Sequence, residues 1–519
     1  MQPVIRLSLA SAFPILAALV PTTRAEGPKM TKITVSKETT CITEPLNPDG
    51  TPNYVAAVNA LCGKGVTPDN NAAVLLLEAL GPAMLKNPDT LGRVCALLRV
   101  PPPPVEGEYF VPFREYAVSH LPQEAQTDIR QRLNDRLAGP WQPKDDPLLA
   151  GWIQANTRSL DVAVSASRRK RMFVPLVSPS DPPTLYDCFM NVSLSAWMEM
   201  GRALAARAML RLGQGQVEAA SADILALHRL GALVSQGPML IDVLIGMALD
   251  KMAGNADGAL ARSGKATGAQ LRRHLAAVAS MPEETGMIQS WDGPERLFAL
   301  DMWILSARKS VREVFGPTLS IQGDPPESLP DYPLDWNEAL RMDNAHTDRL
   351  VAARRLPTFR QRIEAVKAVM AEIDKIVGPD KKAYSRKMVK LVKANRRRDP
   401  AKITRATFHY LAGCCSLSPE GILTVEEQVH AFRRIAVVSL ALAVWRAEKG
   451  SYPDKLDALS PAVLKALPPD PFTDKPLIYR RAGEGYVLYS VGPNMTDDGG
   501  VGSSEKKGAD DFSLDARPE

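Results

Sequence analysis

The sequence predicts a mainly α-helical protein, in which a multi-block helical body carries a small C-terminal α+β hairpin module. Apolar residues recur at steps of three and four along most of the chain, which is the spacing of one helix face. Prolines are concentrated in clusters between these stretches, where they break helices. Near the end of the chain, two short segments, "PLIYRRA" and "YVLYSVG", alternate around a "GEG" turn, which is typical of a β-hairpin.

Residues 1–25 have the pattern of a secretory signal peptide. A basic residue precedes the apolar run Leu7–Val20, and Thr23 and Ala25 fit an A-x-A-like cleavage site. The run is shorter than the roughly 20 residues that cross a bilayer, so cleavage after Ala25 is favoured over an uncleaved anchor. We therefore expect a mature chain that is periplasmic or secreted.

Charge and hydropathy argue against two kinds of partner. The formal net charge is +5 over 519 residues, which is too mild to indicate nucleic-acid binding. The most apolar later stretch, Ile435–Trp445, has 11 residues between arginines, which predicts a buried core helix. We expect no nucleic-acid partner and no transmembrane segment in the mature chain.

Proline clusters at 101–104, 174–183 and 316–333 divide the chain into helical blocks. The expected regions after the signal peptide are an N-terminal helical region (26–104), a central helical domain (105–333), a long-helix region (334–420) and the C-terminal module (421–519).

Six cysteines are too few for a disulfide-built scaffold in a chain of this length. Cys41 and Cys62 flank one short segment and are the preferred pair for a disulfide in an exported protein.

The central helical domain carries polar side chains inside apolar helical stretches: Glu199, Asp223, His228 and Asp242. A buried carboxylate must be paired or shift its pKa, and two alternatives stay open. Nearby arginines favour a structural ion-pair network, whereas paired carboxylates would suit acid–base chemistry in a hydrolase. Asp223 and His228 are five residues apart and do not share a helix face. The chain also lacks the H-E-x-x-H, G-x-S-x-G and Gly-rich dinucleotide patterns.

A heptad-like seam follows a capping box formed by Thr358 and Gln361. Its apolar residues alternate by four and three: Phe359, Ile363, Val366, Met370, Ile373 and Val377. The seam is expected to pack on another helix of the same chain or to join two copies in self-association.

Two basic clusters, "RRKR" at 168–171 and "RRR" at 396–398, lie beside proline or loop signals. A solvated charged face would account for them, and so would contact with phosphate or an anionic membrane surface. Both alternatives remain open on sequence grounds.

The local signals of the C-terminal module agree with one another. Thr424 and Glu427 fit a capping box, the helix is expected to continue to Lys449, and Gly450 stands where a left-handed residue ends a helix. Because an isolated hairpin is marginal in water, the hairpin that follows must pack on this helix.

The order of motifs in the module resembles the C-terminal globular part of the major pseudopilins of type II secretion systems. The motifs are "GSYPDKLDAL", "DPFTDKPLIY", "GYVLYSVGPN" and "DDGG". In that family, a D-P-aromatic turn, here Asp470–Phe472, precedes a short sheet and an acidic loop that binds calcium. The resemblance covers this module and nothing upstream.

The resemblance implies a set of calcium ligands in the acidic loop: Asn494, Asp497, Asp498, Asp510 and Asp511. Calcium takes six to eight oxygen ligands, and Gly499 and Gly500 permit turns that aim carbonyls inward. The lysine-rich stretch "VGSSEKKGA" departs from the family's spacing, so a metal-free acidic loop is the alternative. The chain also lacks the family's short basic leader and Glu-bearing first helix, and we do not expect a pilus subunit.

Together, these features predict an exported bacterial protein with a non-catalytic structural or interaction role and a protein partner in the cell envelope. Calcium is the one candidate cofactor. The alternative is an extracytoplasmic hydrolase that uses carboxylates of the central helical domain.

Overall fold

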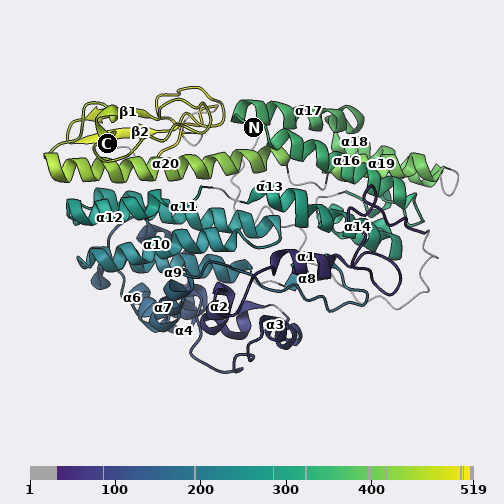
Figure 1. The fold of residues 1–519 in the computed structure, drawn as a ribbon, viewed down its shortest axis with the longest axis horizontal. Helices are drawn as coiled ribbons and strands as arrows, with labels where there is room; N and C mark the ends of the chain where they lie inside the picture. The colour runs from purple at the N-terminus through teal and green to yellow at the C-terminus, as the bar shows by residue number, and fades with distance from the viewer. Residues whose placement is uncertain are drawn as a thin grey trace. The chain divides into compact units, whose positions relative to one another are not determined.

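The computed structural model confirms a mainly helical protein with a small antiparallel sheet near the C-terminus (Figure 1). The residues that the structure describes are 32–85, 87–191, 194–283, 286–321, 324–394, 399–414, 418–502, 505 and 508–514. The signal peptide expected over 1–25 and the basic cluster at 396–398 lie outside these residues.

Two compact units divide the chain, and each collects three separate segments. Unit 1 comprises Met1–Leu61, Leu176–Asn191 and Met287–Leu423, and unit 2 comprises Cys62–Pro175, Val192–Gly286 and Thr424–Glu519. Each unit therefore combines segments from several of the blocks that the proline clusters outline.

Unit 1 is built from helices and short helical turns. Its elements are α1 (Tyr54–Cys62), α8 (Leu185–Asn191), α13 (Met287–Ser290), the π-helical turn η5 (Trp291–Glu295), α14 (Arg296–Arg308), α15 (Val311–Ile321), η6 (Pro326–Ser328), α16 (Trp336–Arg354), α17 (Phe359–Val377), α18 (Lys381–Ala394) and α19 (Pro400–Cys414). The last helix of the chain, α20 (Pro419–Lys449), begins in this unit and continues in unit 2.

The heptad-like seam forms one face of α17 and is largely buried within unit 1. The capping box of Thr358 and Gln361 is present as expected. Five of the six seam residues are less than 9% exposed: Phe359, Ile363, Val366, Ile373 and Val377. Met370 is only half-buried, and Val369 is buried instead. Because α17 packs on α16 and α19, with Val377 against Gly413, the seam is occupied inside the chain.

Unit 2 contains the remaining helices and the sheet. Its elements are α2 (Ala72–Leu80), η1 (Gly81–Met84), η2 (Pro88–Thr90), α3 (Leu91–Leu98), α4 (Phe113–His120), η3 (Gln123–Ala125), α5 (Ile129–Leu137), η4 (Pro143–Asp145), α6 (Pro147–Ala155), α7 (Thr157–Ala166), α9 (Leu194–Gly213), α10 (Val217–Val234), α11 (Leu240–Arg262), α12 (Gly268–Ala279), η7 (Leu456–Leu459), β1 (Ile478–Ala482) and β2 (Gly485–Tyr489).

Helices α10 and α11 approach each other closely in the core of unit 2. A Cβ added at Gly231 would lie 2.7 Å from the carbonyl oxygen of Gly246, and a Cβ at Gly246 would meet Gly231 in the same way. Only glycine at both positions allows the two backbones to approach this closely. The crossing brings His228, one turn before Gly231 on α10, into contact with Asp250, one turn after Gly246 on α11.

The C-terminal hairpin agrees with the expected strands, but the helix before it begins earlier than expected. Strands β1 and β2 pair antiparallel, from Ile478 with Tyr489 to Ala482 with Gly485. The capping box predicted at Thr424 is wrong, because α20 already begins at Pro419. Ser418 caps it instead: its hydroxyl accepts the backbone N–H of Gly421 at 3.1 Å.

Two further expectations agree with the structure, the end of α20 and the lack of a membrane-spanning helix among the described residues. The expected disulfide between Cys41 and Cys62 does not. Gly450 ends α20 in the left-handed region, with φ +83°. Within the described part of the chain, no helix combines the length and the apolar character that crossing a membrane requires. Cys41 and Cys62 are both free cysteines, so the expected disulfide between them is absent.

Candidate functional site

The acidic loop is closed by backbone pairing between the end of β2 and the last described segment. Ser490 and Phe512 exchange two backbone hydrogen bonds of 3.1 Å. Gly492 permits the close approach, because its φ is +69° and a Cβ there would collide with the carbonyl oxygen of Asp510. The two stretches of acids, far apart in this loop, therefore come together beside the hairpin.

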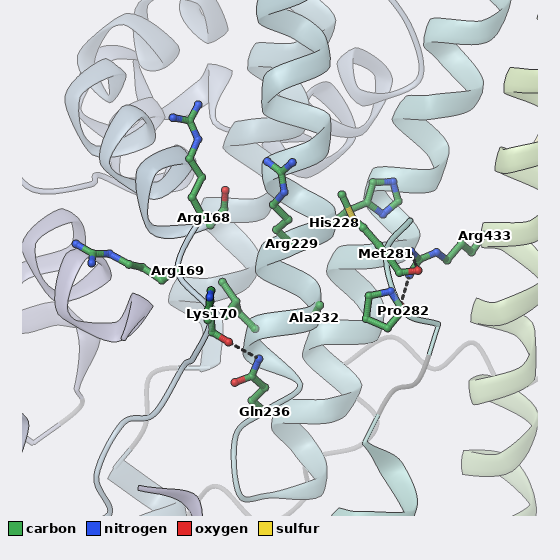
Figure 2. A pocket seen from close by; sticks show the side chains of 12 residues that line it. Arg168, Arg169, Lys170, His228, Arg229, Ala232, Gln236, Met281, Pro282 and Arg433 are labelled. Atoms are coloured by element: carbon green, nitrogen blue, oxygen red, sulfur yellow. Dashed lines mark hydrogen bonds between the residues drawn. The ribbon is translucent and has the colours of Figure 1, made fainter. Parts of the chain in front are cut away.

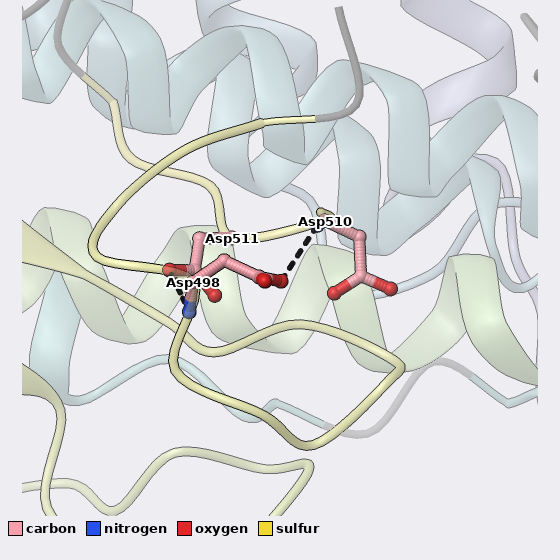
Figure 3. Close-up of side chains that lie close together, drawn as sticks. All are labelled: Asp498, Asp510 and Asp511. Atoms are coloured by element: carbon pink, nitrogen blue, oxygen red, sulfur yellow. Dashed lines mark hydrogen bonds between the residues drawn. The ribbon is translucent and has the colours of Figure 1, made fainter. Parts of the chain in front are cut away.

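Three of the five predicted calcium ligands converge in the structure. One carboxylate oxygen from each of Asp498, Asp510 and Asp511 lies within 4.8 Å of the others (Figure 3). Asp511 is 3% exposed, and its Oδ2 accepts the backbone N–H groups of Asp498 at 2.9 Å and Gly500 at 2.7 Å. The Oδ1 atoms of Asp510 and Asp511 are buried and accept no hydrogen bond from a described residue. A cation would satisfy these oxygens.

The other two predicted ligands have different partners. Asp497 accepts a hydrogen bond of 2.8 Å from the Tyr489 hydroxyl. The side-chain amide of Asn494 donates to Asp498 at 2.8 Å, while its oxygen accepts the N–H of Thr496 at 2.6 Å. Asp497 thus lies outside the acidic triad, and Asn494 supports the triad from its edge.

Burial and neighbouring negative charges raise the pKa of two members of the triad, Asp510 and Asp511. Burial, and then the carboxylates of Asp498 and Asp511, raise the pKa of Asp510 to about 6. Burial also raises the pKa of Asp511, to which the negative charges of Asp497 and Asp498 contribute. A bound cation would offset this repulsion and lower the pKa of both groups.

The D-P-aromatic turn that precedes the hairpin is tied to the strand that leads into the loop. Asp470 is 1% exposed, and its two oxygens accept the N–H groups of Phe472 and Val491, each at 3.0 Å. Phe472 then packs edge-on against Phe512. A single buried carboxylate therefore fixes the turn, the strand end and, through Phe472, the last segment.

Of the polar residues singled out in the central helical domain, Asp223 is held by arginines. Asp223 is fully buried, and Arg207 donates two hydrogen bonds to its carboxylate, at 2.7 and 3.1 Å. Arg211 donates a third at 2.8 Å, and Arg207 also pairs with Asp161 at 2.7 Å. Burial raises the pKa of Asp223, and the two arginines oppose this effect and occupy both of its carboxylate oxygens.

Glu199 and Asp242 also have local structural partners. Glu199 forms an ion pair with Arg202, one turn along α9. Asp242 caps α11, where its Oδ2 accepts the backbone N–H of Met239 at 3.0 Å. The contacts of these acids favour the structural alternative over paired catalytic carboxylates.

His228 lies in a buried chain of side chains that the sequence analysis did not identify. Its Nδ1 lies 2.6 Å from Asp250 Oδ1, and its Nε2 lies 2.8 Å from Asp257 Oδ2. Asp257 also contacts His274 Nε2 at 2.6 Å, and His274 Nδ1 lies 2.6 Å from the Ser221 hydroxyl. His228, Asp257 and His274 are each at most 2% exposed.

In this hydrogen-bonded series, the positive charge of His228 and the negative charges of Asp250 and Asp257 stabilise one another. Although burial lowers it, the carboxylates of Asp257 and Asp250 raise the pKa of His228 to about 9. Burial opposes ionisation of Asp257 as well, but His228 and His274 lower its pKa to about 2. His228 is therefore an imidazolium that donates one hydrogen bond to each neighbouring carboxylate.

Part of this hydrogen-bonded series could be recognised in the sequence from residue spacing. Asp250 and Asp257 are seven residues apart, which places both on one face of α11. Ser221 and His228 have the same spacing on α10. No pattern in the sequence, however, pairs the two faces or brings His274 to them from α12.

Comparisons with known proteins do not assign the chain to a family. No protein-family model matches it, and neither the curated proteins nor the solved structures include a match.

Proposed function

We propose that this chain is an exported, non-catalytic protein of the bacterial cell envelope, with a pseudopilin-like interaction module that calcium stabilises. The observation that carries the proposal is the acidic triad of Asp498, Asp510 and Asp511, two of whose buried oxygens lack a hydrogen-bond partner among the described residues. The motif order in 421–519 and the signal-peptide pattern in 1–25 support the family resemblance and the export.

The residues of the loop fit a hard divalent cation. All three side chains offer carboxylate oxygens, and calcium accepts such oxygens together with backbone carbonyls in flexible geometry. Gly499 and Gly500 both have φ near +77°, so the loop turns sharply beside the triad. A bound cation would supply charge neutralisation here.

The position of the triad indicates a structural role for the cation. Asp498 belongs to the loop after β2, whereas Asp510 and Asp511 belong to the segment that pairs with Ser490. Phe512 of this segment packs on Phe432 of α20, with ring centroids 4.8 Å apart. Holding the three acids together would therefore fasten the C-terminal segment to the hairpin and the helix, as a stable interaction surface requires.

The hydrolase alternative has less support. Ser221, His274 and Asp257 are hydrogen-bonded in series, which is the composition of a serine-hydrolase triad. In such a triad the carboxylate stabilises positive charge on the bridging histidine. Here Asp257 also contacts the His228 imidazolium, which neutralises the carboxylate charge that would otherwise stabilise a protonated His274.

Thermal unfolding of the full chain with and without calcium tests the module. We expect about 5 mM calcium to raise the melting temperature by about 3 °C, and a chelator to reverse the change. Asp511→Asn should abolish the response, because it removes a buried ligand charge. Asp497→Asn is the matched control and should keep the response, because Asp497 binds Tyr489 instead.

An unchanged melting temperature in wild type would contradict the calcium site, as would equal responses in the two variants. Export is tested separately by cell fractionation and N-terminal sequencing. The protein should be recovered outside the cytoplasm with Glu26 as its first residue, and an intact Met1 in the cytoplasmic fraction would contradict export.

A further inference from the structure

A second polar feature of unit 2 is a cavity of about 480 Å³ whose lining carries positive charge and no carboxylate (Figure 2). The loop after α7, one face of α10, the segment after α12 and one residue of α20 form its walls. The lining residues are Ser167, Arg168, Arg169, Lys170, His228, Arg229, Ala232, Leu233, Gln236, Met281, Pro282 and Arg433.

Two of these cations are already compensated and form the wall of the cavity. His228 is held between Asp250 and Asp257 behind the cavity. Arg433 donates to the carbonyl oxygens of Val278, Met281 and Pro282 at 2.9 to 3.3 Å, and it lies 3.8 Å from Asp250. These two residues therefore shape the wall of the cavity, and its uncompensated positive charge comes from the other lining cations.

Arg229 and Arg168 are not compensated in this way. Neither forms an ion pair with a carboxylate among the described residues, and Arg229 is half-buried in the middle of α10. Burial, and then the positive charge of Arg168, lower the pKa of Arg229. In Figure 2 the side chains of Arg168 and Arg229 both extend towards the top of the view, whereas that of Arg169 extends to the left.

An ordinary structural role does not account for Arg229. Arg168 and Arg169 follow the C-terminus of α7, where cations stabilise the helix dipole. Arg229 is inside a helix, gains nothing from that effect, and lies beside a like charge while partly removed from water. A ligand with negative charge would turn this unfavourable arrangement into a favourable one.

The loop that presents Arg168 is anchored on both sides. Gln236 donates to the carbonyl oxygen of Lys170 at 3.4 Å and accepts the N–H of Met172 at 3.2 Å. Backbone hydrogen bonds join Arg171 to Asn70 and Ala72, at 3.1 and 2.8 Å. The backbone of the loop is therefore held in place beside the cavity, so that only the exposed Arg168 side chain has to be ordered on binding.

We propose that this cavity is an anion site that binds a phosphate group through Arg229 and Arg168. Planar guanidinium groups offer paired donors that match phosphate oxygens, and a group with two charges answers two unpaired cations. The phosphate belongs to a soluble phosphate compound or to a lipid headgroup. The site is separate from the acidic triad, and the two arginines that bind the phosphate lie outside the C-terminal module, which contributes Arg433 to the wall.

Calorimetric titration of the full chain with pyrophosphate, at constant ionic strength, tests the site. We expect saturable binding that Arg229→Gln weakens at least about tenfold. Arg130→Gln in α5 is the matched control, because Arg130 is an exposed arginine of the same unit outside the cavity, and it should leave binding unchanged. Equal binding by the two variants would overturn the proposal. So would the absence of heat beyond that of chloride in a protein that also fails to float with phosphatidylglycerol vesicles.

Thermal unfolding without phosphate distinguishes a binding role from a structural one. Arg229→Gln removes an uncompensated cation, so its melting temperature should equal or exceed that of wild type. A clear decrease would mean that Arg229 holds the fold, and would contradict the site.

Vesicle flotation identifies the source of the phosphate group. Flotation with phosphatidylglycerol vesicles that Arg229→Gln abolishes would support the site with a lipid headgroup as its ligand. Pyrophosphate binding without flotation would support it with a soluble ligand. If wild type neither floats nor binds pyrophosphate, the proposal fails.

Discussion

Asp257, among the helices of unit 2, and Asp510, in its C-terminal loop, are both drawn out of water, but their acidity changes in opposite directions. The pKa of Asp257 falls to about 2, against the effect of burial, because two histidines donate to its carboxylate. The pKa of Asp510 rises to about 6, because burial is reinforced by neighbouring carboxylates. Removal from water acts in the same direction at both sites, and the charge of the neighbours decides the outcome.

This difference separates acids whose charge is neutralised inside the fold from acids whose charge is not. The buried series of hydrogen-bonded side chains around His228 contains its own cation, the His228 imidazolium, which offsets the charge of the neighbouring carboxylates. The acidic triad contains none, and its buried Oδ1 atoms at Asp510 and Asp511 have no hydrogen-bond partner among the described residues. The basic cavity has the opposite charge to the triad, because arginines line it in place of carboxylates. Uncompensated charge of either sign is therefore the feature that indicates binding in this protein.

The largest expected effect follows removal of the Asp257 carboxylate, which His228 and His274 share. Asp257→Asn leaves the His228 charge with one carboxylate fewer and His274 without its charged acceptor. We expect the free energy of unfolding to fall by about 3 kcal/mol, measured by urea denaturation. Asp454→Asn is the control, since Asp454 is 88% exposed and pairs only at the surface with Arg481. A loss no larger than that of the control would remove the distinction between the two regions.

The next effect is a loss of stability in alkaline solution. The folded-state pKa of His228, about 9, is above its ordinary value of 6.5. Its stabilising contribution is therefore complete below pH 6.5 and is lost as the pH rises through 9. We expect a decrease of about 2–3 kcal/mol between pH 6 and 10.

His228→Gln provides the comparison for the alkaline effect. The variant should be less stable at pH 6 and should show a flatter pH dependence in the same urea titrations. A wild-type curve that stays level up to pH 10 would contradict the imidazolium assignment.

The smallest effect has the opposite sign and concerns the acidic triad. In chelator, Asp510→Asn should stabilise the protein at pH 7 by less than about 1 kcal/mol, because it relieves repulsion in a half-exposed cluster. The folded-state pKa of Asp510 lies above its ordinary 3.8, so wild-type stability should rise as the pH falls from 7 towards 4. The variant should lack this rise, and calcium should no longer stabilise it. A destabilised variant would show that the triad is part of the fold instead of a ligand site.

Much of the local structure could be predicted from the sequence, because the signals act over a few residues. The periodicity of 359–377 predicted α17 and its buried face, and Gly450 predicted the left-handed end of α20. The alternation around "GEG" predicted β1 and β2. The error at Thr424 has a local cause as well, since Ser418 and Pro419 form an earlier start that competes with it.

The candidate sites could be predicted only in part. The family resemblance indicated all three acids of the triad, but it also included Asp497, which the Tyr489 hydroxyl draws away. In the helical part of unit 2, the sequence drew attention to His228 without its partners. The basic run at 168–171 was visible, whereas its meeting with Arg229 was not.

The sequence by itself determined the helical class, α17 with its cap, the end of α20, the hairpin and the group of acids in the loop, because periodicity, caps and turns depend on neighbours in the chain. Tertiary structure alone decided which charges meet. Asp250 and Asp257 reach His228 because Gly231 and Gly246 let α10 and α11 approach closely, and His274 then joins them from α12. Electrostatic pairing depends on distance in space, and distances across a helix crossing are set by packing that no local pattern encodes.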